Sequence, residues 1–385
     1  MTGTSEPTFT CTATGTPTSA DTETLTPENT LTITETNTGT ATATSTCTAT
    51  GTPTGTDTTT VTITYTAEDT KTITETITNT ATPTSTCTAT ATLYPYSGLI
   101  TVPAGTFKQT NAGNPGVEYF SSTVSGFKMG QYLVTYDLWY VVRQWALANG
   151  YSFQNAGLEG NTGVIGAAPT AAKYRPVSSI SWRDAIVWSN AYSEKSGLQP
   201  CYTYLSAVIR NSTNANAAAC DGAVCEWANN GYRLPAESEY QYAASWRGTN
   251  SGDGAVEFPA ASGNFWTPYN YASGATADTT DAAATGLVAW YNTNCSGTMD
   301  VGGKLPNQLG IFDMSGNIWV WCWDFYGSFP VTDKTDYRGP ATGPNRVQKG
   351  GAFCTDESAI KTGARVPYGP YDGANYIGFR IARTY

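Results

Sequence analysis

Polar and apolar positions alternate in the first part of the chain, where nearly every second residue up to Leu93 is Thr. A two-residue period of β-branched side chains is typical of a strand. Recurrent Pro and Gly, with few large apolar side chains, favour instead an extended and often O-glycosylated stalk without a core of its own. We therefore expect residues 1–97 to form a Thr-rich repeat stalk, disordered or extended, or else a β-ribbon.

The Thr-rich part is an imperfect repeat. The block from Ile33 to Thr50 recurs forty residues later from Ile73 to Thr90, and each copy contains one cysteine. Stacking of such ribbons between chains would allow self-association, so a structural fibre or surface-layer component is one hypothesis for the protein.

After Tyr94 the pattern changes, and three helical periods can be recognised. They predict helices over 136–148, 182–195 and 236–245. Thr135 and Ser181 are suitable N-caps for the first two, and Pro235 suits the start of the third. Beyond Asn250 no helical period is visible, which indicates short strands and long loops. Residues 98–385 (the head) are thus expected to be one α+β domain with much irregular structure.

Charge and apolar content exclude several functions. The net charge is −10 and no stripe of Lys and Arg occurs, so we expect no nucleic-acid binding. No apolar run approaches the roughly 18 residues of a membrane span. The chain contains no histidine, which removes the usual general base and the commonest metal ligand. The start Met1-Thr2-Gly3-Thr4 has no signal-peptide pattern, so export would need a leader outside this sequence or another route.

Six of the nine cysteines lie in the head, which suits disulfides and an extracellular or cell-surface location. Cys201 and Cys225 flank one insertion and are the expected pair. Buried, unpaired thiols in a cytosolic protein are the alternative.

Several motifs of the head, taken together, resemble the formylglycine-generating enzyme (sulfatase-modifying factor) family. The resemblance covers nearly all of the chain from Val102 onward and implies a C-type-lectin-like fold. The motifs, in order, are Val102–Phe107, Pro176–Ala185, Asn230–Tyr240, Leu309–Cys322, Lys349–Phe353 and Gly378–Arg383.

The resemblance also implies which residues would carry the family's chemistry, the oxidation of a substrate cysteine at a copper ion held by two cysteines. Those two positions correspond here to Thr355 and Ile360, and Cys354 is only adjacent to the first. One thiolate without histidine does not make a multi-ligand copper site. We therefore expect no enzyme activity, with an active oxidase-type modifying enzyme as the alternative.

A calcium site of the family is also altered. Val320 stands where the family has an acidic ligand, and Asn264 in Asn264-Phe265-Trp266 matches another calcium-binding segment loosely. Calcium at Asn264 is the one cofactor that the resemblance allows.

The last stretch resembles the variable proteins of bacterial diversity-generating retroelements. In those proteins a Gly-Gly-small-aromatic start and an Ile-Gly-Phe-Arg end bracket the variable positions, as Gly350–Phe353 and Ile377–Arg380 do here. A relative that is not diversified is equally compatible with this pattern. Tyrosines among Gly, Ser, Asn and Asp are typical of recognition surfaces. The expected ligand-binding residues are Thr355, Asp356, Ser358, Tyr368, Tyr371, Asp372, Asn375 and Tyr376.

These patterns favour a non-catalytic surface or secreted protein of adhesin or receptor type. The head would bind an unknown protein or carbohydrate, since its many Trp and Tyr also suit stacking on sugars. The alternative to a binding surface is that these tyrosines line an ordinary loop.

Overall fold

The computed structural model describes residues 96–116, 118–249 and 265–385. In the Thr-rich part it describes only the backbone of four strands, with β1 antiparallel to β4 and β2 antiparallel to β3. Their bounds are β1 Asn29–Ile33, β2 Thr44–Ala49, β3 Thr59–Thr64 and β4 Ile73–Ile77. The choice between stalk and ribbon stays a prediction. Tyr96–Tyr385 forms one compact unit.

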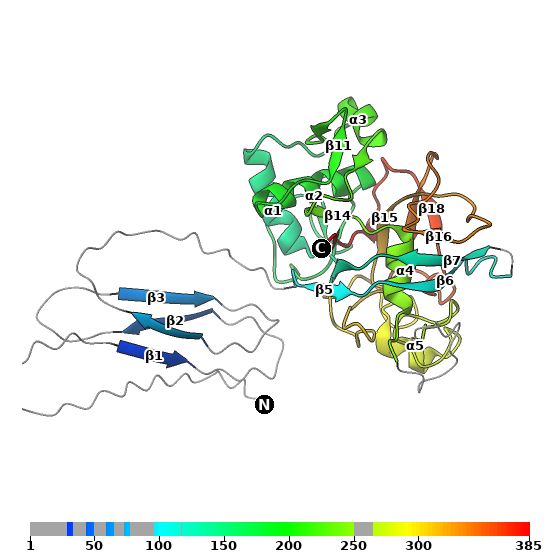
Figure 1. Cartoon of the computed structure of the whole chain (residues 1–385), viewed down its shortest axis with the longest axis horizontal. Helices are drawn as coiled ribbons and strands as arrows, with labels where there is room; N and C mark the ends of the chain where they lie inside the picture. The colour runs from blue at the N-terminus through cyan, green and yellow to red at the C-terminus, as the bar shows by residue number, and fades with distance from the viewer. Residues whose placement is uncertain are drawn as a thin grey trace, which may run out of the picture. The chain divides into compact units, whose positions relative to one another are not determined.

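The three expected helices are present, and their caps explain where they begin. Helix α1 (Tyr136–Ala148) starts after Thr135, whose hydroxyl accepts a hydrogen bond from the Leu138 amide. Helix α2 (Trp182–Lys195) starts after Ser181 in a capping box with Asp184. Helix α4 spans Glu237–Ser245. In Figure 1, α1 and α2 lie together on one side of the head, and α4 lies beside β6 and β7.

The expectation of no helix beyond Asn250 is wrong. Helix α5 spans Ala282–Val288, and the Asp281 carboxylate caps it by accepting the amides of Ala283 and Ala284, each at 3.0 Å. Seven residues are too few to produce a visible helical period. A short α3 (Ala217–Asp221), preceded by a 3₁₀ turn (Asn214–Asn216), was also not foreseen.

In the described part of the head, the strands form five small sheets. The orders are β14-β20-β8-β5, β18-β17-β15-β19, β16-β7-β6, β12-β11-β13 and β10-β9. The bounds are β5 Leu99–Val102, β6 Gly105–Thr110, β7 Tyr119–Val124, β8 Phe127–Gly130, β9 Leu158–Glu159, β10 Val177–Ser178, β11 Tyr202–Tyr204, β12 Ala207–Val208, β13 Val224–Cys225, β14 Tyr232–Arg233, β15 Trp319–Phe325, β16 Lys334–Thr335, β17 Arg346–Lys349, β18 Val366–Tyr368, β19 Ile377–Gly378 and β20 Ala382–Arg383. Short strands between long loops confirm the α+β, irregular fold.

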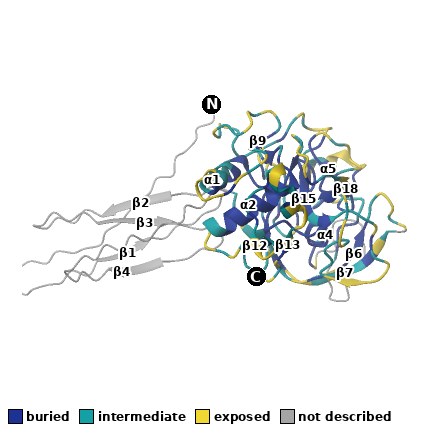
Figure 2. Cartoon of the chain, turned by 90° about the horizontal axis from the view of Figure 1, so that it is seen from above, coloured by how far each residue is buried: buried dark blue, intermediate teal, exposed yellow. Residues whose placement is uncertain are grey.

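The core is rich in tryptophan. Trp182 and Trp321 are fully buried and Trp319 is nearly so. Helix α2 and strand β15 contribute most of their residues to this interior, which appears dark blue in Figure 2. Among the described residues the longest helix has 14 residues, and none has the length and hydropathy to cross a membrane.

Candidate binding surface

Two consecutive glycines turn the chain out of β17 and begin the candidate segment. Gly350 and Gly351 have φ values of 91° and 74°, a left-handed conformation that favours glycine. A Cβ on Gly350 would lie 2.6 Å from the Tyr240 hydroxyl, and one on Gly351 would lie 2.7 Å from Ile360. The Gly-Gly motif is therefore required by the backbone and by close packing.

The two positions that correspond to the family's catalytic cysteines serve structural purposes here. The Thr355 hydroxyl closes a turn, since it accepts the Ala352 amide at 3.0 Å and donates to the Ala352 carbonyl at 2.9 Å. Ile360 is completely buried in a small apolar cluster with Val288 and Tyr291. Restoring a thiolate pair at these sites would thus remove a turn contact and part of the core.

Thr355, Asp356 and Ser358 form one exposed turn. Asp356 accepts hydrogen bonds from both the amide and the hydroxyl of Ser358, at 3.0 and 2.5 Å, and these bonds lower the pKa of Asp356. Next to this turn lies Cys295, whose sulfur is 3.9 Å from the Phe353 carbonyl oxygen. Burial raises the pKa of both Cys295 and Cys354, so neither thiol is poised as a thiolate at neutral pH.

A second group of residues lies on strand β18 and the stretch that follows it up to β19, residues 366–376, called here the 366–376 loop. Main-chain hydrogen bonds hold this loop against the start of α2: the amide of Arg183 donates to Pro370, and that of Ser179 donates to Ala374. The Trp319 amide in turn donates to the Tyr376 carbonyl at 2.9 Å. The loop is therefore fixed through its backbone, while the side chains of Tyr371, Asp372 and Asn375 are exposed.

The tyrosines of this loop form a small aromatic surface. The Tyr376 hydroxyl hydrogen bonds with Tyr368 and, together with burial, raises the pKa of Tyr368 to about 12. The Tyr368 ring packs edge-on against Trp321, with centroids 5.9 Å apart. Tyr371 is 57 % exposed and lies 5.7 Å from the Arg183 guanidinium. Rigid rings with exposed edges and one cation nearby suit recognition of a polar or aromatic ligand.

All eight expected ligand-binding residues are exposed or half-buried, but they fall into two groups. Tyr368, Tyr371, Asp372, Asn375 and Tyr376 share the 366–376 loop, whereas the other three share the 354–358 turn. Their role in binding stays a proposal.

Arg183, Asn161 and Cys295 also lie at this surface, and the sequence analysis did not assign them to it. Arg183 is clamped by Asp221 through hydrogen bonds of 2.8 and 2.6 Å. Asn161 accepts a hydrogen bond at its carbonyl from Asn375 at 3.3 Å. Arg183 lies in a family-like motif, which was a usable signal. Asn161 and Cys295 lie in loops far from the segment in sequence, and nothing in their surroundings marks them.

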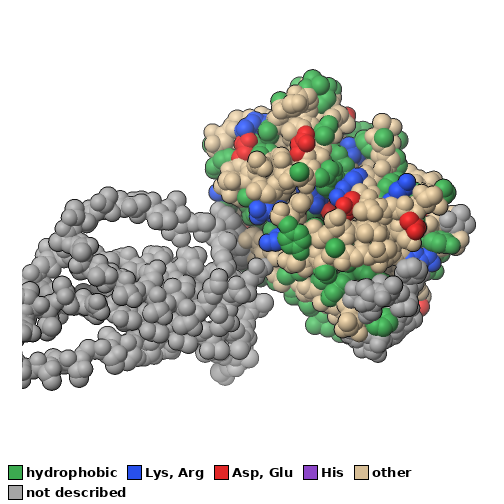
Figure 3. Space-filling view, in the orientation of Figure 1, with side chains coloured by type: hydrophobic (Ala, Val, Ile, Leu, Met, Phe, Trp, Pro, Cys, Tyr) green, Lys and Arg blue, Asp and Glu red, His purple; other side chains and the backbone are tan. Residues whose placement is uncertain are grey.

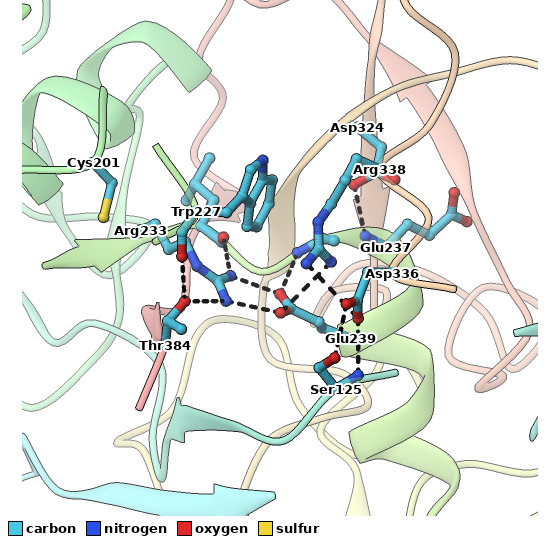
Figure 4. A network of polar contacts seen from close by, with 12 residues as sticks. Ser125, Cys201, Trp227, Arg233, Glu237, Glu239, Asp324, Asp336, Arg338 and Thr384 are labelled. Atoms are coloured by element: carbon cyan, nitrogen blue, oxygen red, sulfur yellow. Dashed lines mark hydrogen bonds and ion pairs between the residues drawn. The ribbon is translucent and has the colours of Figure 1, made fainter. Parts of the chain in front are cut away.

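A buried ion pair joins strand β14 to helix α4. Arg233 binds Glu239 in a two-point contact, with distances of 2.7 and 2.8 Å (Figure 4). Burial alone would raise the pKa of Glu239, but the guanidiniums of Arg233 and Arg338 outweigh it and hold the pKa below its usual value. The same close-up shows Asp324 beside the amide of Glu237, which donates to it at 2.7 Å.

The protonation of Asp324 is expected to make the stability of the head depend on pH. Burial, followed by the charge of Glu237, raises the pKa of Asp324 to about 7, and its Oδ1 atom has no hydrogen-bond partner. The folded state keeps a proton here that the unfolded chain loses near pH 4, so stability falls as the pH rises from about 4 to 7.

We expect Asp324→Asn to abolish this fall and to stabilise the head at pH 8 by on the order of 2 kcal/mol. Urea unfolding at pH 5 and pH 8 measures it. Asp372→Asn, which alters an exposed carboxylate, is the control, and an unchanged pH slope in Asp324→Asn would contradict the prediction.

The remaining predicted sites are less informative. Cys201 and Cys225 are buried free thiols on neighbouring stretches, the Glu226 amide donating to the Cys201 carbonyl, and their pairing stays a prediction. Asn264 lies outside the described residues. Val320 is fully buried in the core.

The face seen in Figure 3 carries scattered charges of both signs among neutral and apolar side chains. It shows no continuous basic stripe of the kind that binds nucleic acid.

Comparison with known proteins agrees with this geometry. Residues 84–385 match the family described as "Sulfatase-modifying factor enzyme 1-like domain". The chain is 29% identical to "Chaperone protein LppX" of Paenibacillus barcinonensis over 305 residues, 74% of this chain and 89% of that protein. It is 38% identical to the formylglycine-generating enzyme of Thermomonospora curvata, but over only 23% of this chain and 31% of that enzyme.

A solved structure, Treponema denticola variable protein 1, superposes with a TM-score of 0.57 and 26% identity, covering 74% of this chain and 95% of that one. The resemblances seen in the motifs are thereby confirmed at the level of the whole head. The chain belongs to the sulfatase-modifying factor enzyme 1-like domain family.

Proposed function

We propose that the head is a non-catalytic ligand-binding domain, displayed at the cell surface or secreted, that binds a protein or carbohydrate through the 366–376 loop. The observation that carries this proposal is the burial of Ile360. The second position of the family's cysteine pair belongs to the core, while the neighbouring loop exposes tyrosines on an anchored backbone.

The similar proteins support this proposal. The relative that matches over 89% of its length is named a chaperone, a name for a protein that binds others, and the structural neighbour is named a variable protein. Neither name denotes an enzyme. Both fit a family member whose fold presents a surface rather than a catalytic pair.

Binding can be tested with the full chain. It is screened against an immobilised glycan array and a phage-displayed peptide library, and the tightest ligand of either class is measured by surface plasmon resonance. We expect Tyr371→Ala to weaken that ligand by roughly tenfold or more, because exposed aromatic anchors contribute most of the energy of such surfaces. Tyr385→Ala is the matched control, since Tyr385 is 63% exposed and Tyr371 57%.

Equal losses for the two variants, or none for Tyr371→Ala, would contradict binding through this loop. The enzyme alternative has its own assay. The protein is loaded with Cu(I) and given oxygen and a cysteine-containing peptide, and oxidation of the peptide thiol at a catalytic rate would overturn the non-catalytic assignment.

We further propose that the coding region of Gly350–Arg380 is diversified by a retroelement. The support is the similarity to a variable protein together with the exposed side chains of Tyr371, Asp372 and Asn375 in the 366–376 loop. A neighbouring reverse-transcriptase gene with a template copy of this region would support it, and a genomic neighbourhood without either would refute it.

A further inference from the structure

Two of the six cysteines of the head are accessible, and the fold brings them together. Cys354 is exposed and Cys295 is half-buried, whereas Cys201, Cys220, Cys225 and Cys322 are buried. An oxidant in solution therefore reaches Cys354 first and Cys295 next.

The distance between the two residues is short. The Cys295 sulfur lies 3.9 Å from the carbonyl oxygen of Phe353, the residue directly before Cys354. In a trans peptide the next Cα lies about 2.8 Å from that oxygen. The Cys295 sulfur is thus within about 7 Å of the Cys354 Cα, and rotation of the two side chains can bring the sulfurs closer together.

The backbones on both sides are held in place. The Cys295 amide donates to the Tyr291 carbonyl at 3.1 Å, and the Phe353 amide donates to the Asn317 carbonyl at 3.0 Å. The Asn292 amide donates to the Thr355 carbonyl at 3.1 Å, which joins the two loops directly. These bonds keep the two loops next to each other.

We propose that Cys295 and Cys354 form an intramolecular disulfide that ties the 354–358 turn to the 291–295 loop. Both are free thiols in this structure. The oxidant is a low-molecular-weight disulfide such as oxidised glutathione. The Cys354 thiolate attacks one of its sulfurs and releases one thiolate, and the Cys295 thiolate then attacks the Cys354 sulfur and releases the second. Two protein thiols and one disulfide thus become one protein disulfide and two small thiols.

The bridge would join Cys295 and Cys354, which are 59 positions apart in the sequence, next to the candidate binding surface. It would restrict the turn that carries Thr355, Asp356 and Ser358. The inference does not depend on the proposed binding function, because it concerns the two thiols alone.

Tryptic peptide mapping of the full chain tests the bridge. The folded protein is incubated with oxidised glutathione at pH 8, alkylated and digested without reduction. Cys295 lies in peptide 248–304 and Cys354 in peptide 350–361, and neither peptide contains another cysteine. We expect the two peptides to be linked, and a reductant to separate them. Free or glutathione-capped peptides, or linkage of either cysteine to a different one, would overturn the proposal.

Two variants test whether the placement of the two thiols, rather than the reactivity of an exposed thiol alone, determines the link. In Cys295→Ser we expect Cys354 to stop at the glutathione adduct. The second variant combines Cys354→Ser with Ser358→Cys, which moves the exposed thiol four residues along the same turn. We expect its link to Cys295 to form at least roughly tenfold more slowly, because residue 358 is farther along the chain from Phe353, whose carbonyl the Cys295 sulfur contacts. Linkage at the original rate would mean that the turn is mobile and that the observed placement does not select the pair.

Discussion

Replacing Arg365 with methionine is expected to destabilise the head by about 3–5 kcal/mol. Arg365 directly precedes β18, and its guanidinium binds Glu237 at 2.7 and 2.8 Å and the Gly327 carbonyl at 2.7 Å. Both side chains of the pair are almost fully buried, with exposures of 2% and 1%. The variant leaves the Glu237 carboxylate buried without its partner, which costs far more than the pair contributes.

A double variant distinguishes the cost of leaving Glu237 unpaired from the cost of the lost Arg365 packing. Arg365→Met combined with Glu237→Met removes both charges, so we expect it to recover most of the stability lost in the single variant. Arg210→Met is the matched surface control. Its ion pair with Glu194 is 41% and 21% exposed, and we expect a loss of about 1 kcal/mol or less. Urea unfolding measures all three, and a loss in Arg365→Met as small as in Arg210→Met would refute the expectation.

The second large effect is expected at Gly316, in the Ser-Gly-Asn motif. Its amide donates to the Gly350 carbonyl at 2.7 Å, and its backbone runs parallel to that of Trp290. A Cβ at this position would lie 2.1 Å from the Trp290 carbonyl oxygen, a backbone atom that cannot move aside cheaply. We expect Gly316→Ala to cost more than about 3 kcal/mol or to prevent folding.

Gly310 provides the control for this substitution. It has the same φ of 79°, but a Cβ there would meet nothing within 4 Å. Gly310→Ala therefore reports the cost of the left-handed backbone alone, about 1 kcal/mol. Thermal unfolding of both variants isolates the steric part as their difference. Equal costs would show that the contact with Trp290 relaxes freely.

The sequence predicted those parts of the fold that depend on local chemistry. Thr135 and Ser181 mark helix starts through their own hydroxyl groups, and the tryptophans of the core follow from recognisable motifs. Helix α5 was missed because its seven residues of Ala, Thr, Gly, Leu and Val carry no period, only the cap at Asp281.

The candidate surface was predictable in its residue types and not in its arrangement. Exposure of Tyr371 and Asn375 follows from a polar, Gly-rich and Pro-rich stretch. The surface is divided into a turn and a loop because Ile360, which lies between them in the sequence, is buried in a cluster with residues from α5. Cys295 and Cys354 come close because two loops that are 59 positions apart in the sequence contact each other in the fold. No spacing rule in the sequence predicts such a contact.

The bonds that hold the ends of the segment have a consequence for its evolution. Phe353 donates its amide to Asn317, and Tyr376 offers its carbonyl to the amide of Trp319, so both ends are fastened to one short stretch of neighbouring backbone. Main-chain groups are common to almost every amino acid. Substitutions at the exposed positions between these two fastenings, unlike those at the buried Ile360 and Arg365, leave both main-chain bonds in place. If the segment binds a ligand as proposed, its specificity can therefore change at little cost in stability.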